Sequence, residues 1–285
     1  MDILLFIQTI IMGIVQGITE WLPISSTGHM ILFDEFMKMQ VSEKFMETFL
    51  VVIQFGSILA VVFLYFSKLN PFTCKGTDTD IKLVGNTFLK RDTLTLYLKV
   101  LVGVIPAAVI GLLFEDKINE IFFNSYVVSV ALIVYGIAFI IIESRKKEPK
   151  HTDLDALSYK TAFLIGMFQI LALIPGTSRS GSTILGAVII GCSRFVAAEF
   201  SFFLAIPVML GASALKLLKA LMEGVVFTGA EWITLTLGTL VSFVVSVLAI
   251  KFLVSYIRKH DFKGFGYYRI VLGIIILLYY LIIVL

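Results

Sequence analysis

Long apolar stretches alternate with short polar ones along nearly the whole chain. Six of the stretches reach the roughly 20 mostly apolar residues that a helix needs to cross a bilayer. They are Phe45–Phe66, Leu94–Phe114, Tyr126–Ile142, Phe200–Leu221, Trp232–Ile257 and Tyr267–Leu285. Pro106 and Pro207 fall inside two of them and predict kinks, which a membrane bundle tolerates when neighbours satisfy the freed carbonyls. We therefore predict six membrane-spanning helices.

Two further apolar stretches are interrupted by the polar loops Pro23–His29 and Pro175–Thr183. The apolar segments on either side are Ile3–Leu22 with Met30–Met37, and Ala162–Ile174 with Ile184–Ile190. The segment that follows each loop is too short to cross the bilayer, so each pair is predicted to be re-entrant. Irregular backbone at membrane depth survives only where protein buries it or where it lines a wet cavity.

The two halves of the chain resemble each other. Gly13-Ile-Val-Gln16 precedes the first loop, and Gly166-Met-Phe-Gln169 precedes the second about 153 residues later. Each loop is followed by a short apolar run, by a helix with Glu47 or Glu199 near its start, and by two more helices. We predict an all-α polytopic membrane protein with about six full spans and four half-helices. It forms a single integral membrane domain, 1–285, with repeat 1 at about 1–143, a cytoplasmic linker at about 144–160 and repeat 2 at about 161–285.

The number of crossings inverts the second repeat, because three spans per half is odd. Inverted repeats with broken helices are a common plan of transporters. Basic residues gather in loop 67–92, in the linker and in the 258–269 loop, the last with Arg258, Lys259, Lys263 and Arg269, whereas Asp116 and Glu223 lie in acidic alternate loops. The positive-inside rule then places both termini outside. The two polar loops are predicted to meet near mid-membrane.

Composition supports a membrane protein. The chain is 59% hydrophobic and 15% charged, with a mean hydropathy of +0.99, whereas a soluble domain carries roughly a quarter charged residues. The net charge of +3 comes from loops and does not indicate nucleic acid as a partner. Cys74 and Cys192 give no basis for a disulfide framework. The N-terminal stretch lacks a basic flank and a small-residue cleavage site, so we do not expect a signal peptide.

The first loop gathers residues that suit an anion. Gln16 and Glu20 are spaced i, i+4 and share a helix face that leads into the loop. Ser25, Ser26, Thr27 and Gly28 then open a short helix, whose N-terminus offers free backbone N–H groups to an anion, with His29 in its first turn.

The second loop repeats this scheme and adds Arg179, whose planar fork suits a phosphate. Single Ser and Thr residues in membranes usually bond helix backbone, and Glu20 or His29 alone is compatible with an interfacial position. An intramembrane Arg is by default functional. One Arg, one His, one carboxylate and two helix N-termini together indicate a buried phosphate-handling site.

Both loops resemble a known family. Gln16-Gly-Ile-Thr-Glu20-Trp-Leu-Pro-Ile-Ser-Ser-Thr-Gly-His29 is similar to the (E/Q)xxxE and SSTGH element of bacterial undecaprenyl-diphosphate phosphatases of the BacA/UppP, bacitracin-resistance type. Pro175-Gly-Thr-Ser-Arg-Ser-Gly181 resembles the second signature of that family, PGxSRSG. Val51–Ala60 and Glu199–Pro207 also match, so the resemblance covers nearly the whole chain. It implies removal of the terminal phosphate of undecaprenyl diphosphate, which regenerates the carrier for peptidoglycan synthesis.

The resemblance also implies roles for single residues. Arg179 would clamp the diphosphate, Ser26 would be the nucleophile, and His29 would act as base or acid. Glu20 with Gln16 would hold Mg²⁺ or Ca²⁺ or orient the nucleophile; Gln stands where many relatives have Glu, which weakens a metal site. The remaining substrate-binding candidates are Ser25, Thr27, Gly28, Gln54, Gly176, Thr177, Ser178, Ser180 and Thr183. Attack by water without a seryl phosphate stays open.

Two other classes remain as alternatives. A transporter or flippase of a lipid phosphate would use the same Arg and helix ends, but it needs no nucleophile beside a base. A membrane scaffold explains neither polar loop. The family implies the bacterial cytoplasmic membrane, with the site facing the outer, periplasmic side, a polyprenyl diphosphate as substrate and a homodimer as one option.

Overall fold

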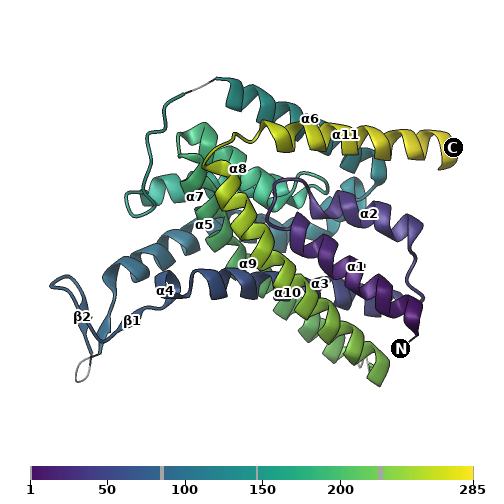
Figure 1. The fold of residues 1–285 in the computed structure, drawn as a ribbon, viewed down its shortest axis with the longest axis horizontal. Helices are drawn as coiled ribbons and strands as arrows, with labels where there is room; N and C mark the ends of the chain where they lie inside the picture. Colours follow the sequence, from purple (N-terminus) through teal and green to yellow (C-terminus); the bar gives the residue numbers. More distant parts are fainter. Residues whose placement is uncertain (1, 84–86, 146, 224–226, 285) are drawn as a thin grey trace.

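The structure, a computed structural model, describes residues 2–83, 87–145, 147–223 and 227–284. Its helices are α1 (Ile3–Thr19), α2 (Ser26–Phe36), α3 (Glu43–Leu64), α4 (Phe66–Leu69), α5 (Arg91–Phe122), α6 (Ser125–Ser144), α7 (Tyr159–Gln169), η1 (Ile170–Leu173), α8 (Arg179–Ile190), α9 (Arg194–Met222), α10 (Gly229–Ile257), α11 (Lys263–Tyr279) and η2 (Tyr280–Val284). Three two-residue strands lie between α4 and α5, namely β1 (Phe72–Thr73), β2 (Ile81–Lys82) and β3 (Phe88–Leu89). The described chain is thus all-α apart from this small sheet (Figure 1).

Six helices within the described ranges are long and apolar enough to cross a membrane. They are α3, α5, α6, α9, α10 and α11. Large apolar side chains on them, among them Leu101, Val130, Leu240 and Phe252, are more than half exposed, as expected of surfaces that face lipid. The prediction of a polytopic helical membrane protein with six spans is therefore confirmed.

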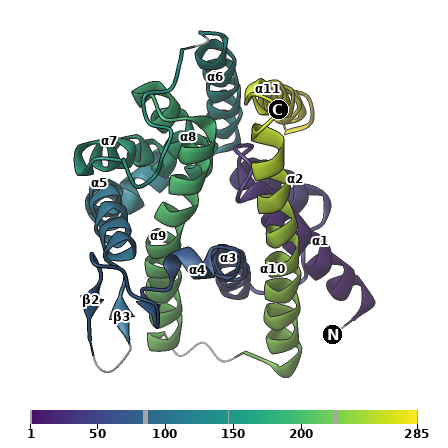
Figure 2. The ribbon, with the colours of Figure 1, turned by 60° about the vertical axis from the view of Figure 1, so that its left-hand side comes forward.

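The packing of the spans follows the same scheme in both halves. Elements α1, α2, α3, α5 and α6 correspond in order to α7, α8, α9, α10 and α11. Helix α1 packs against α10, and α7 packs against α5; α3 contacts α9, and α6 contacts α11. Figure 1 shows α6 and α11 side by side, and Figure 2 shows α3 between the long helices α9 and α10. The residue limits of the two repeats and the linker stay predictions.

Glycine permits the closest of these approaches. At the α6–α11 contact, a Cβ on Gly136 would lie 2.6 Å from the carbonyl oxygen of Gly266, and a Cβ on Gly266 would lie 2.7 Å from that of Gly136. Both distances are below van der Waals contact. The two backbones therefore meet through paired glycines, as small residues allow in membrane helices.

Two pairs of shorter helices carry the polar loops. Helix α1 has 17 residues and α2 has 11, while α7 has 11 and α8 has 12. All are shorter than the roughly 20 residues of a span. Polar side chains of α1, including Gln8, Thr9 and Gln16, are buried against protein. This arrangement places the loops 20–25 and 174–178 within the helix bundle.

The 67–92 loop contains secondary structure that the hydropathy pattern did not predict. Its strands form an antiparallel sheet in the order β1-β3-β2, in which Leu89 pairs with both Phe72 and Ile81. Pro106 and Pro207 lie inside α5 and α9, as expected from the sequence. The sheet lies outside the predicted spans and contributes nothing to the polar loops.

Candidate functional site at the two polar loops

The two loops have the same backbone geometry at the start of their second helix. Ser25 precedes α2 and Ser178 precedes α8, and both have φ = 72°, a left-handed conformation that is unusual outside glycine. Each hydroxyl oxygen accepts a hydrogen bond from the backbone N–H three residues later, at 3.3 Å from Gly28 and 3.1 Å from Gly181. Strained residues of this kind cluster at functional sites. The N-termini of α2 and α8 are therefore capped by equivalent serines.

The loops contact each other directly, as the sequence predicts. Arg179 at the start of α8 forms an ion pair with Glu20 after α1, with 2.9 Å between Nη2 and Oε1. The Ser180 hydroxyl donates to the carbonyl of Leu22 at 3.3 Å. Residues about 159 positions apart in the chain thus form one buried polar cluster.

Arg179 is held from several sides. Its Nη1 donates to the carbonyl and the hydroxyl of Ser201 on α9, at 2.9 and 3.3 Å, and its guanidinium lies 5.4 Å from the ring centre of Trp21. Thr183 fixes Ser201 through a 2.6 Å hydroxyl contact. The Nε of Arg179 has no hydrogen-bond partner among the described residues. This donor is therefore buried and unpaired in this conformation.

A second arginine, which the sequence placed with the basic loop 258–269, joins the same two loops. Arg269 lies in α11 and is fully buried, so assigning it to a cytoplasmic loop was wrong. It donates to the carbonyl of Pro23 in the first loop at 3.1 Å, and to those of Gly176 and Thr177 in the second at 2.8 and 2.9 Å. Main-chain carbonyls replace the water that a charged side chain would otherwise seek.

A cavity of about 500 Å³ opens beside the Arg179–Glu20 pair. One part of its wall is polar, made by Glu20, Ser26, Thr27, Gln54, Gln169, Gly176, Ser178 and Arg179. The rest is apolar and comes from α5, η1 and α9, with Val104, Ala107, Leu112, Leu173, Pro207 and Leu215 among its residues. A wider hollow of about 760 Å³ shares four wall residues with this cavity and is lined by charged side chains, including Glu47, Asp116 and Lys216. The cavity thus has a polar and an apolar part, which together suit an amphiphilic ligand.

The structure divides the residues that the sequence predicted. Seven line the cavity: Glu20, Ser26, Thr27, Gln54, Gly176, Ser178 and Arg179. The others lie in or behind the loops. The Thr177 hydroxyl donates to the carbonyls of Leu171 and Ile174. The Thr183 hydroxyl donates to the carbonyl of Arg179. Both hydroxyls thus stabilise the local main chain. Ser25, Gly28 and Ser180 likewise shape or join the loops.

His29 is not among the residues that line the cavity. Its Nδ1 lies 2.7 Å from the carbonyl oxygen of Ser25, so this nitrogen carries the proton, and its Nε2 lies 2.6 Å from the hydroxyl of Tyr268 on α11. No hydrogen bond joins His29 to Ser26 in the described structure. The predicted serine–histidine pair is therefore not assembled in this conformation.

Glu20 and Gln16 offer few ligand atoms to a metal ion. The two carboxylate oxygens of Glu20 accept from Arg179 and from the Gln16 Nε2, each at 2.9 Å. Among the described residues no group of three or more His, Cys, Asp or Glu side chains is placed to hold a metal ion. The oxygens of Glu20 and Gln16 fit Mg²⁺ or Ca²⁺ only if phosphate oxygens of a substrate complete the coordination shell. Mg²⁺ is usually bound in this way, by one or two carboxylates together with substrate phosphates.

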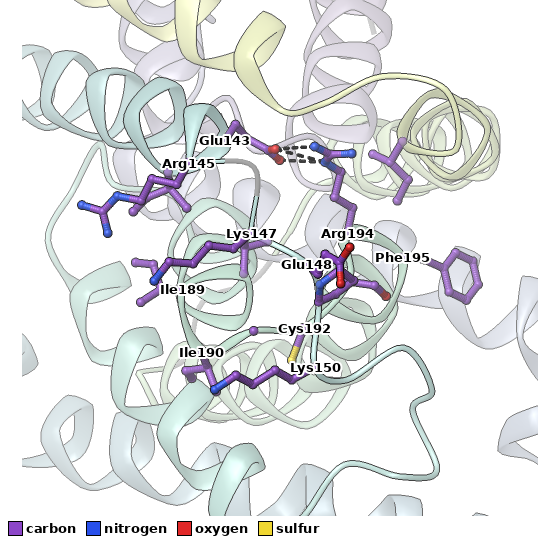
Figure 3. A pocket seen from close by; sticks show the side chains of 16 residues that line it. Glu143, Arg145, Lys147, Glu148, Lys150, Ile189, Ile190, Cys192, Arg194 and Phe195 are labelled. Carbon is purple, nitrogen blue, oxygen red and sulfur yellow. Dashed lines mark hydrogen bonds and ion pairs between the residues drawn. The ribbon is translucent and has the colours of Figure 1, made fainter.

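A separate hollow of about 420 Å³ lies at the linker (Figure 3). There Arg194 at the start of α9 meets Glu143 of α6 through three contacts of 2.6 to 3.1 Å. Glu143 also accepts from the backbone N–H of Phe262 at 3.3 Å. The ion pair ties the linker end of α6 to α9 and to the start of α11. None of the predicted site residues lines this hollow.

Sequence reasoning missed three contributors to the site. Arg269, Ser201 and Gln169 were not assigned to it. Arg269 had a signal, because it falls inside the predicted span Tyr267–Leu285, where a charge is by default functional. Ser201 lies in the family-matched stretch Glu199–Pro207, but its contact with Arg179 depends on how α9 packs.

Comparisons with known proteins identify the family of this chain. The family model described as "Bacitracin resistance protein BacA" matches residues 9–275. Undecaprenyl-diphosphatase 1 of Clostridioides difficile is 62% identical, covering 96% of this chain and 95% of its own. The undecaprenyl-diphosphatases of Enterococcus faecalis and Acetivibrio thermocellus are 58% and 56% identical, each covering 96% of this chain and 97% of its own. The chain therefore belongs to the bacitracin resistance protein BacA family.

Proposed function

We propose that this protein hydrolyses undecaprenyl diphosphate to undecaprenyl phosphate and inorganic phosphate. Family membership over residues 9–275 and relatives named undecaprenyl-diphosphatase support this activity. The main structural support is that Arg179, Glu20 and Ser26, which come from two loops, line one cavity whose remaining wall is apolar. The reaction returns the lipid carrier to peptidoglycan synthesis and gives bacitracin resistance.

The cavity suits both ends of this substrate. The diphosphate carries several negative charges, which Arg179 and the N-termini of α2 and α8 attract. The prenyl chain has no polar groups and fits the apolar wall from α5, η1 and α9. A water-soluble phosphate ester would leave this wall unused. The apolar character of the wall therefore favours a lipid diphosphate.

The reaction proposed for Ser26 has two steps. The hydroxyl oxygen attacks the terminal phosphorus, the bond from phosphorus to the bridging oxygen breaks, and undecaprenyl phosphate leaves. Water then attacks the seryl phosphate, which releases inorganic phosphate and restores the hydroxyl. Arg179 stabilises the charge that develops on the transferred phosphoryl group. In the one-step alternative, water attacks the terminal phosphorus directly.

His29 is the proposed acid or base, and this role requires a change in its hydrogen bonds. Because Nδ1 donates to Ser25, only Nε2 is able to accept a proton, and Tyr268 now occupies it. Participation of His29 therefore requires its ring to exchange Tyr268 for the reacting group. Loss of activity in His29→Gln, with the melting temperature retained, supports this role.

A divalent cation is part of the proposal. Gln16 and Glu20 would hold it together with the diphosphate oxygens, and it would neutralise phosphate charge. The two side chains also orient Arg179 by themselves, through the Glu20 ion pair. Removal of Mg²⁺ and Ca²⁺ with a chelator should lower activity and leave the melting temperature unchanged.

The proposed setting is the cytoplasmic membrane, with the site open to the periplasmic side. The positive-inside rule supports this orientation, because basic residues gather in the linker and in loop 67–92. The hollow of about 760 Å³ next to the cavity carries both acidic residues and lysines, among them Glu47, Asp116, Lys216 and Lys219. A homodimer is proposed as well, and the mass of the purified protein in detergent, measured by light scattering, tests it.

Transport of a lipid phosphate is the second candidate. The matched broken helix pairs α1–α2 and α7–α8 favour it, because carriers bind anions at such breaks. Ser26 in the cavity wall favours hydrolysis, since binding alone needs no nucleophile.

Phosphate release from a polyprenyl diphosphate decides between them. Wild type in detergent should release phosphate, and Arg179→Ala should lose this activity. Lack of release from wild type, with and without Mg²⁺ or Ca²⁺, would remove the enzyme proposal. Full activity of Ser26→Ala would leave hydrolysis intact and assign the attack to water.

A further inference from the structure

Gln169 is a buried polar residue in the cavity wall. It is the last residue of α7, is 2% exposed, and lines the cavity together with Ser26, Ser178 and Arg179. Neither its Nε2 nor its Oε1 has a hydrogen-bond partner among the described residues. A buried amide without partners destabilises a folded protein, so its presence calls for an explanation.

The other half of the chain shows what Gln169 lacks. Gln16 occupies the corresponding place before the first loop, and its Nε2 donates to Glu20 four residues later at 2.9 Å. Four residues after Gln169 the chain has Leu173, which accepts nothing through its side chain. Gln169 therefore lies in the cavity wall without the carboxylate that engages Gln16. An apolar side chain of similar size would fill this space at lower cost.

The local backbone does not use the amide either. After Gln169 the chain tightens from α-helix to the 3-10 turn η1, and the N–H of Ile170 is shared between the carbonyls of Met167 and Phe168. Such 3-10 turns are common at the C-terminus of an α-helix, and this one needs no contact from the Gln169 side chain. Two residues of η1, Ala172 and Leu173, line the same cavity. The segment from Gln169 to Leu173 thus forms part of the cavity wall.

We propose that Gln169 binds substrate: its Nε2 donates a hydrogen bond to a phosphate oxygen of the lipid diphosphate. This inference rests on the proposed function. Phosphate oxygens only accept hydrogen bonds, so among the two amide atoms the nitrogen is the one that serves them. Arg179 in the same wall supplies the charge that brings the diphosphate within reach. The wall encloses the amide in this structure, and no hydrogen bond opposes the side-chain rotation that turns it toward the ligand.

The test compares Gln169→Leu with wild type and with Gln8→Leu. Gln8 is a matched control, because it is also buried but donates to the carbonyls of Met37 and Lys38, outside the cavity. In Gln169→Leu we expect KM for a polyprenyl diphosphate to rise about ten-fold with kcat little changed, as for loss of one hydrogen bond to a charged group. The melting temperature without substrate should rise, since an unpaired amide is removed. Gln8→Leu should lower the melting temperature and leave KM unchanged.

Binding is measured separately from hydrolysis. Farnesyl diphosphate should raise the melting temperature of wild type, and the rise should be smaller in Gln169→Leu. If wild type releases no phosphate but this difference persists, the proposed activity fails and the role of Gln169 stands. If farnesyl diphosphate stabilises both proteins equally, or if KM stays within two-fold of wild type, the role of Gln169 is overturned.

A second variant covers a failure of Gln169→Leu to fold. Gln169→Glu has nearly the same size, loses the donor and repels the phosphates when ionised. We expect its KM to rise at least as much, with a rise that shrinks as the pH is lowered and the carboxyl group gains a proton. A melting temperature below that of wild type together with an unchanged KM would show that Gln169 is purely structural.

Discussion

Replacement of Arg269 by methionine should loosen the contact between the two polar loops. Methionine keeps the length and apolar stem of the side chain but removes hydrogen bonds to Pro23, Gly176 and Thr177 at 2.8 to 3.1 Å. Hydrogen bonds to a charged group contribute roughly 1.5–3 kcal/mol each, so the gross loss is about 5 kcal/mol or more. The variant no longer buries a cation, which offsets several kcal/mol. The free energy of unfolding should therefore fall by about 2–4 kcal/mol.

The melting temperature in detergent measures this change. For a protein of this size about 2–4 °C is lost per kcal/mol, so Arg269→Met should melt about 4–16 °C lower. Activity should fall about 100-fold, because small displacements of positioned groups have effects of that order. Arg258→Met makes the same chemical change at an exposed position and should alter neither quantity. A melting temperature within 1 °C of wild type and activity within three-fold would refute the assignment of Arg269 as the residue that joins the loops.

Three further predictions concern the Arg179–Glu20 ion pair, the exposure of the two cysteines and the packing of α6 against α11. Glu20→Gln and Arg179→Met should each lower the melting temperature, and the double variant should lose less than the sum, because the partners form one buried pair; additive losses would contradict the ion pair. Cys74 is exposed, whereas burial raises the pKa of the Cys192 thiol to about 11, so a membrane-impermeant maleimide at pH 7.5 should label only Cys74. With the proposed orientation this labelling occurs in inverted vesicles and not in intact cells, and the reverse would invert the topology. Gly136→Val should destabilise the protein by separating α6 from α11, whereas Gly229→Ala, which meets no atom within 4 Å, should not; equal melting temperatures would argue against the close packing.

Hydropathy alone predicted the six spans, the two broken helix pairs and the polar loops. The reason is that the bilayer imposes a length and an apolar composition that can be read locally. The capping serines Ser25 and Ser178 are likewise local, because each bonds within three residues. Short motifs around Glu20 and Arg179 then pointed to the family and its chemistry.

Only the tertiary structure decided how these residues are used. His29 contacts Tyr268, which lies 239 residues away in the chain, and does not bond to Ser26 in the described structure. Thr183 holds Ser201 of the next helix behind Arg179, and this contact depends on how α8 packs against α9. Arg269 looked like an ordinary basic residue at the end of a loop, and the packing of α11 buried it between both loops. A pattern along the chain records which face of a helix is apolar, whereas the partner of a polar side chain is set by the helix that packs against that face.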